Sequence, residues 1–318
     1  MPHRHRRRFV IAATFRALPF TAAAAAGVAA NVLLGLSSLF WKALAAIPPV
    51  TLLCIRIGAS LVTLLLVMGM LGRFRALLAK LGRRNLAIHA MAAVLVALNW
   101  ATFIWASIHG HVIESGLGYL LAPFVAIGAG SLAYRERLSR GRMAALLVIA
   151  ICVLVLSQRS QELAHWVYLL IGITWGAYAC MKKATALDGF GGLLCETAVL
   201  ALLLPGVLMA SSLHLSVPSP LPAGTLVLLA ASGLVSVLPL WLFSMAAARL
   251  PITVMGFFQF VLPLTQLVVA LVFYRQPLSL NSLLCFGIIC IALLSILSGP
   301  VLARRRRRSP PGAANEIS

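Results

Sequence analysis

The sequence contains few charged residues, and acidic ones are especially scarce. Only 10% of its 318 residues are charged, with six Asp and Glu against 26 Lys and Arg. Soluble globular domains usually carry about 25% charged residues. The mean hydropathy is +1.02, and the apolar runs, at about 20 residues each, are long enough to cross about 30 Å of hydrocarbon. The scarcity of charge therefore excludes an ordinary soluble domain and predicts a polytopic membrane protein.

Two kinds of motif are also missing. None of the six cysteines has the spacing of metal ligands, and all six fall within apolar runs, where we expect them to be small buried packing residues. No glycine-rich loop of the form GxxxxGK followed by Ser or Thr occurs, so ATP is not the direct energy source through this chain. No metal, nucleotide or other cofactor is therefore expected.

The excess of positive charge is concentrated at the ends of the chain and between the apolar runs. This distribution of the net charge of +20 argues against a nucleic-acid partner. The RRRFV segment resembles a twin-arginine signal, but Arg16 interrupts the apolar run that follows. We therefore expect residues 1–19 to be an uncleaved cytoplasmic arm, and whether the arm belongs to the mature chain stays open. The basic tail over residues 304–318 is expected to be disordered.

Ten transmembrane helices are expected, at residues 20–41, 50–71, 87–108, 112–134, 143–157, 165–182, 190–210, 224–247, 252–273 and 281–299. Lys and Arg gather at both termini and in alternate connections, whereas the opposite side holds only Lys42, Arg159 and Arg275. Cytoplasmic loops carry the excess of basic residues. Both termini are therefore predicted to lie in the cytoplasm, with the protein in the cytoplasmic (inner) membrane.

The chain also resembles itself at a fixed offset. A shift of 140 residues aligns Asn99–Ser139 with Pro239–Ser279, and YRERLS meets YRQPLS at the end of that alignment. A repeat of five helices is inverted in its second copy, which is the architecture of alternating-access transporters. Duplication for stability alone is the open alternative. The expected organisation is an arm (1–19), a first five-helix repeat (20–160), a second (161–303) and a tail (304–318).

Apart from the histidines and Lys182, which lies at a helix border, three ionisable side chains lie within or at the edge of the expected spans: Arg56, Glu114 and Glu196. A charge at the bilayer centre costs about 2.5–3.5 kcal/mol on insertion scales, so each indicates a functional site. Arg56 and Glu114 are nearer the outside and Glu196 nearer the inside. Arg56 and Glu196 can therefore pair only if both side chains reach toward the middle or if a helix is broken. Glu196 has no polar neighbour on its own helix, so another helix, water or a proton must meet its charge.

The segment HGHVIE, at 109–114, superficially offers metal ligands. His109 and His111 diverge on a helix and converge only in a tight turn, with Glu114 as a third ligand. A hydrophilic outer turn that exchanges protons near the mouth is the favoured interpretation. A hydrolytic group of Ser107, His109 and Glu114 is the enzymatic alternative, although its first two members also diverge on a helix.

Several segments resemble the RarD-type branch of the drug/metabolite transporter superfamily, whose members have EamA-like five-helix repeats. They are NWATFIWASIHGHVIESGLGYLLAP (99–123), RERL (135–138), CETAVLALLLP (195–205), LPLWLFSMAAARLP (238–251) and GFFQFVLP (256–263). The resemblance implies an all-α, ten-helix secondary carrier with two inverted repeats, both termini inside, that exports or exchanges small metabolites or drugs.

We therefore predict a secondary active transporter, not an enzyme, for a small metabolite or drug-like solute, with protons taken up at Glu114 or Glu196. The alternatives are a membrane scaffold or lipid-handling protein and, less favoured, an intramembrane enzyme. Membrane lipid is an expected partner, and monomer or homodimer stays open. The predicted solute and ion pathway is Arg56, Asn99, Trp100, His109, Glu114, Tyr119, Glu196 and Gln259. The predicted packing or hinge residues are Gly116, Pro123, Gly256 and Pro263.

Overall fold

The computed structural model describes residues 19–133, 135, 138–158, 164–185, 187–210, 215–275, 280 and 284–292. Most of the predicted arm, the whole tail and both ends of the predicted tenth helix lie outside these residues. So do Arg159, which the charge argument placed on the outer side, and Tyr134 of the YRERLS segment.

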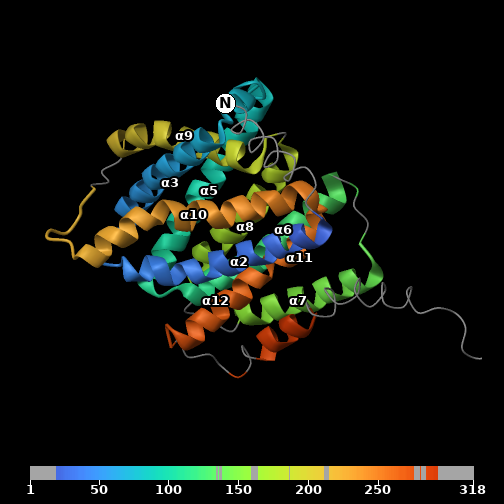
Figure 1. Cartoon of the computed structure of the whole chain (residues 1–318). Coiled ribbons are helices and arrows are strands. Elements are labelled where there is room, and N and C mark those ends of the chain that lie inside the picture. Colours follow the sequence, from blue (N-terminus) through green and yellow to red (C-terminus); the bar gives the residue numbers. More distant parts are fainter. Residues whose placement is uncertain are drawn as a thin grey trace, which may run out of the picture. The chain divides into compact units, whose positions relative to one another are not determined.

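The described chain is helical, and it contains no strand. Its helices are α2 (Phe20–Ala43), α3 (Pro49–Leu71), α4 (Phe74–Leu78), α5 (Arg83–His109), α6 (Val112–Ala133), α7 (Arg140–Gln158), α8 (His165–Ala184), α9 (Gly189–Ala210), α10 (Ala223–Arg249), α11 (Ile252–Gln259) and α12 (Val261–Val272) (Figure 1). Most of residues 284–292 are also helical. The predicted all-α class is confirmed.

Seven helical segments among the described residues are long and apolar enough to cross a membrane. They are α2, α3, α5, α6, α9, α10 and the combined α11 and α12. Helix α7 contributes a shorter apolar stretch, Met143–Val155. The chain is a multi-pass membrane protein, whereas ten spans and two inverted repeats remain predictions.

The span Ile252–Val272 is interrupted near its middle. Helix α11 ends at Gln259 and α12 begins at Val261, with Phe260 between them still in helical conformation. Pro263 lies four residues after Gln259 and has no backbone N–H to donate to its carbonyl, which weakens the helix at this point. Pro123 and Pro239 occupy the interiors of α6 and α10 in the same way.

Two compact units make up the chain. The first consists of residues 1–136 and 163–277 and holds α2 to α6 and α8 to α12; the second consists of residues 137–162 and 278–318 and holds α7. Every candidate site residue predicted from the sequence belongs to the first unit.

Helices α6 and α8 approach closely because both carry glycine at the contact. A methyl group at Gly172 would lie 2.8 Å from the Cβ of Leu121, and one at Gly176 would lie 2.5 Å from the Cβ of Val125. Such distances are too short for real Cβ atoms, so the two backbones can be this near only without side chains there. Small residues are the usual means of packing helices that cross a membrane.

The turns of the first unit gather at two ends. At one end Arg73 pairs with Asp188 at 2.9 Å, and the Lys183 ammonium donates to the Leu250 carbonyl at 2.9 Å. At the other end the Tyr274 hydroxyl donates to the Ser107 carbonyl at 3.1 Å. These contacts join turns that an alternating up-and-down path of helices brings to the same end.

Candidate functional site

Arg56 lies two turns into α3, and its side chain is buried between two indole rings. Its guanidinium carbon lies 3.9 Å from the ring centroid of Trp100 and 4.8 Å from that of Trp41, while the residue is 2% exposed. A desolvated cation over an aromatic face gains about 2 kcal/mol. Its Nε and Nη1 atoms are buried and have no hydrogen-bond partner among the residues that the structure describes. The structure thus brings together two residues of the predicted pathway, Arg56 and Trp100, and leaves two guanidinium nitrogens unpartnered among the described residues.

Asn99 and Tyr119 are two further residues of the predicted pathway that the structure brings together. The Tyr119 hydroxyl donates to Asn99 Oδ1 at 3.0 Å, and Asn99 Nδ2 donates to the Thr174 hydroxyl at 3.2 Å. These bonds link α6, α5 and α8. The ring of Tyr119 packs edge-on against Trp175 of α8, with 6.0 Å between the ring centroids. This pair is a satisfied polar link between three helices.

Other polar groups in the same unit are buried without partners. Gln259, at the end of α11, is 0% exposed, and neither its amide oxygen nor its amide nitrogen has a hydrogen bond. Gln266 of α12 donates to the Ser115 hydroxyl at 3.3 Å, but its amide oxygen is unpartnered. Leaving a buried donor or acceptor unsatisfied costs about 1–3 kcal/mol. Each such group therefore requires an explanation, such as a bound solute or an ordered water.

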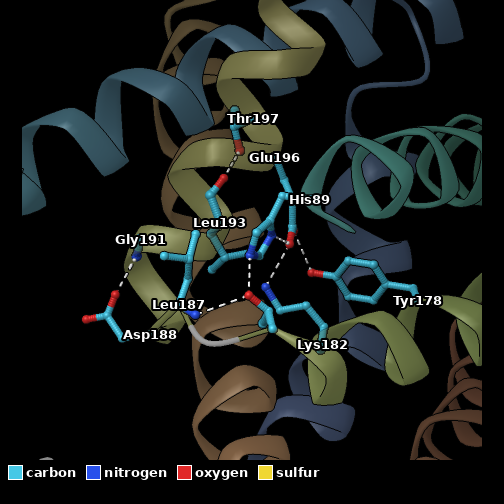
Figure 2. Close-up of polar contacts among 10 residues, drawn as sticks. His89, Tyr178, Lys182, Leu187, Asp188, Gly191, Leu193, Glu196 and Thr197 are labelled. Atoms are coloured by element: carbon cyan, nitrogen blue, oxygen red, sulfur yellow. Dashed lines mark hydrogen bonds and ion pairs between the residues drawn. The ribbon is translucent and has the colours of Figure 1, made fainter. Parts of the chain in front are cut away.

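Glu196 of α9 is the centre of a buried ionic cluster. Its Oε1 accepts a hydrogen bond from the Lys182 ammonium at 2.9 Å and lies 2.7 Å from Nδ1 of His89. Its Oε2 accepts from the Tyr178 hydroxyl at 3.0 Å. Figure 2 shows these three side chains pointing at the carboxylate from α5 and α8. The sequence left three possibilities for balancing the charge of Glu196: another helix, water or a proton. The structure shows side chains from other helices in this role.

The turn before α9 positions the helix that carries the Glu196 carboxylate. Asp188 accepts a hydrogen bond from the Gly191 N–H at 2.9 Å and so caps the start of α9. Nε2 of His89 lies 2.7 Å from the Thr185 hydroxyl, which in turn accepts from the Leu187 N–H at 3.1 Å. A short turn therefore holds the imidazole and the beginning of α9 together, as Figure 2 shows.

Sequence reasoning missed the partners of Glu196. Lys182 was treated as a residue at the helix border, and His89 was not considered. A signal was present, because Tyr178 and Lys182 are four residues apart and therefore share one face of a helix. Glu196 is engaged by these residues, and Arg56 forms no ion pair with it in the part of the chain that the structure covers.

The outer turn predicted from HGHVIE separates its histidines. His111 Nδ1 lies 2.6 Å from the Glu114 carboxylate, whereas His109 Nδ1 lies 2.9 Å from the Trp105 carbonyl. Both imidazoles stack on the indole of Trp105, at 4.5 and 5.0 Å between centroids. Gly110 ends α5 between them with a φ of 81°. A shared metal with Glu114 would need His109 to turn away from this stack.

Ser107, His109 and Glu114 are not arranged as the hydrolytic group that the enzymatic alternative requires. The Ser107 hydroxyl donates to the Phe103 carbonyl at 2.7 Å, one turn back on its own helix. It is not directed at His109, and His109 is not directed at Glu114. The three side chains do not form a chain of nucleophile, base and orienting acid.

The predicted packing or hinge residues differ in how closely neighbouring atoms approach them. A methyl group at Gly256 would lie 2.6 Å from Cγ1 of Ile127, so α11 approaches α6 closely there. At Gly116 the nearest atom would be Oε1 of Gln266, at an ordinary 3.6 Å. Pro123 and Pro263 are buried within α6 and α12.

The chain is similar to several bacterial proteins over most of its length. Protein RarD of Streptomyces exfoliatus is 32% identical over 292 residues, which cover 91% of this chain and 92% of that protein. The uncharacterized transporter YojE of Bacillus subtilis is 31% identical over 282 residues, covering 87% and 94%. Protein RarD of Escherichia coli is 30% identical over 221 residues, covering 68% and 73%.

No family model matches the sequence. One solved crystal structure of a protein aligns with a TM-score of 0.64 at 17% identity, over 90% of this chain and 100% of that one. At that identity the likeness concerns the fold alone.

Proposed function

Because the chain belongs to the RarD branch of the drug/metabolite transporter superfamily, we propose that it is a secondary active transporter of a small organic solute. In this proposal the solute crosses the cytoplasmic membrane by alternating access, coupled to protons, with both termini of the chain in the cytoplasm. The relatives carry the names of transporters, and seven apolar helices support a membrane location.

The observation that carries the proposal is the set of unpartnered polar atoms inside the first unit. Arg56, Gln259 and Ser60 come from helices that a scaffold would fill with apolar side chains. Each is at most 2% exposed, and each has buried polar atoms without a hydrogen-bond partner among the described residues. Polar groups inside a membrane protein mark substrate and ion pathways because their burial is costly. A bound solute would supply the missing partners.

A conformational change also has a structural basis. The interruption between α11 and α12 lies directly beside Gln259, so a change of helix direction there would move this amide. Transporter sites are commonly formed by discontinuous helices near the middle of the membrane. We place Gly256 and Pro263 at this hinge, with Pro123 on the facing helix α6.

For proton coupling, Glu114 is better placed than Glu196. A coupling carboxylate must exchange its proton with water, and His111, whose imidazole contacts the Glu114 carboxylate, has a side chain that is 32% exposed. Glu196 is held by a lysine, a tyrosine and a histidine, and its side chain is 2% exposed. The lysine stabilises its ionised form, which suits a structural ion pair.

Access to the interior from both sides tests the mechanism. In a variant without the six native cysteines, a cysteine at Gln259 should react with an impermeant thiol reagent from either side of a proteoliposome. A cysteine at Leu120, equally buried but packed in apolar surroundings, is the matched control and should not react. Reaction of neither cysteine, from either side, would point to the scaffold or lipid-handling alternative.

A further inference from the structure

Arg56 has no counter-ion within the described chain, because each described acidic residue is committed elsewhere. Glu114 faces His111, Asp188 pairs with Arg73, and Glu196 pairs with Lys182. The rings of Trp41 and Trp100 lie against the guanidinium, and its buried Nε and Nη1 atoms have no hydrogen-bond partner among the described residues. The charge is therefore shielded from water without being neutralised.

The neighbours of Arg56 add donors. Ser60 is one turn further along α3, on the same face of the helix, and its hydroxyl is buried without a partner. The indole N–H of Trp41, whose ring contacts the guanidinium, is also buried and unpartnered. A guanidinium, a hydroxyl and an indole N–H together offer hydrogen-bond donors around a single positive charge.

We propose that Arg56, Ser60 and Trp41 bind the carboxylate of a transported organic acid, a refinement that rests on the transporter function proposed above. The planar guanidinium matches the planar carboxylate, and charge-assisted hydrogen bonds of this kind are strong. One arginine neutralises one negative charge, so a monocarboxylate fits the site better than a phosphate, which carries about 1.5–2 charges at pH 7. The carbon skeleton of the acid would extend along the two tryptophans.

The choice of variants separates this role from a structural one. Arg56→Met keeps the length of the apolar stem and removes the charge and the donors. Because the charge is not neutralised by a partner, its removal should leave the melting temperature of the free protein unchanged or raised. Arg56→Lys keeps the positive charge and loses the planar arrangement of N–H donors that matches a carboxylate. Arg84→Met, at an exposed arginine near the start of α5, controls for general attraction of anions to a basic protein.

The probes are paired acids and primary amides with the same skeleton: butyrate with butyramide, benzoate with benzamide, and 3-phenylpropionate with 3-phenylpropionamide. The readout is the melting temperature of the purified full-length protein over a range of ligand concentrations, since a ligand of the native state raises it. At least one acid should stabilise the wild type and Arg84→Met more than its amide does. Arg56→Met should weaken binding of that acid on the order of 10-fold to 100-fold, and Arg56→Lys should weaken it less.

Two results would overturn the proposal: no acid binds better than its amide, or Arg56→Met binds the acid as the wild type does. If Arg56→Met fails to fold, the test uses Arg56→Lys and Ser60→Ala instead. The proposal would then be overturned if both variants prefer the acid over its amide as strongly as the wild type does. Failure of the transporter function is a different result, seen when neither acids nor neutral solutes cross the membrane through the wild-type protein.

Discussion

The ammonium of Lys182 lies 2.9 Å from the carboxylate of Glu196, with both side chains at most 3% exposed. The bond joins α8 to α9, and Tyr178 and His89 supply further contacts to the same carboxylate. A buried ion pair of this kind contributes little when it is compared with apolar replacements of both partners. Loss of one partner is much more costly, because the other charge is then buried alone.

Glu196→Gln and Glu196→Met should therefore each destabilise the protein by about 3–5 kcal/mol, and Lys182→Met by a similar amount. The double variant Lys182→Met with Glu196→Met should recover most of that loss. The measurement is reversible unfolding of the purified protein in mixed detergent micelles, analysed as a double-mutant cycle. Asp188→Asn, which breaks the half-exposed pair with Arg73, is the control and should change stability by no more than about 1 kcal/mol.

A stable Glu196→Gln protein that has lost only its response to a proton gradient would contradict this assignment. That result would assign proton coupling to Glu196, the second of the two carboxylates that the sequence offers for this role.

Glu114→Gln should flatten the dependence of solute flux on pH and abolish accumulation driven by a proton gradient. The reason is that glutamine cannot take up and release a proton, whereas the Glu114 carboxylate beside the part-exposed His111 can. The measurement is solute uptake into proteoliposomes at several pH values, with flux normalised to the amount of folded protein. His109→Gln is the control, since that imidazole faces a backbone carbonyl and not Glu114. Unchanged accumulation in Glu114→Gln would remove this residue from proton coupling.

Gly176→Ala should destabilise the contact between α6 and α8 by about 1–3 kcal/mol, because the added methyl group would meet Val125 at 2.5 Å. Gly128→Ala makes the same change where no atom lies within 4 Å. There the substitution should be neutral or should stabilise the helix by up to about 1 kcal/mol. Thermal unfolding of both variants is the comparison, and equal melting temperatures would show that the two helices separate without cost.

How far the sequence predicts this molecule depends on whether a feature is local. Apolar runs are local, and they placed the start of α2 at residue 20 and the span of α11 and α12 within a residue of the structure. Arg56 stands out because a charged side chain is conspicuous in an apolar helix, and Trp100 because it lies in a segment that resembles the RarD-type branch. Their contact, and that of Asn99 with Tyr119, required the fold.

The partners of Glu196 show the limit of that reasoning. Its own helix carries no polar neighbour, and the compensating Lys182 and His89 are 14 and 107 positions away. No periodicity within one helix connects residues at such separations. Likewise the two histidines of HGHVIE share a segment, but the left-handed Gly110 turns them to different partners.

Orientation in the membrane can be tested with single cysteines in a cysteine-free background. Leu81, in the basic turn before α5, is exposed and is predicted to face the cytoplasm. Leu215, exposed in the segment after α9, is predicted to face the opposite side. An impermeant reagent added to intact cells should label Leu215→Cys and spare Leu81→Cys. The reverse labelling pattern would place both termini outside.

Solute flux through the purified protein tests the central claim most directly. Full-length protein is reconstituted into proteoliposomes, and uptake of a labelled solute that raises its melting temperature is followed with and without an imposed proton gradient. The account predicts saturable uptake that exceeds uptake by protein-free liposomes, accumulates against the solute gradient and collapses when an ionophore dissipates the proton gradient. Binding of the solute without any uptake above that of protein-free liposomes would contradict the assignment of this chain as a secondary transporter.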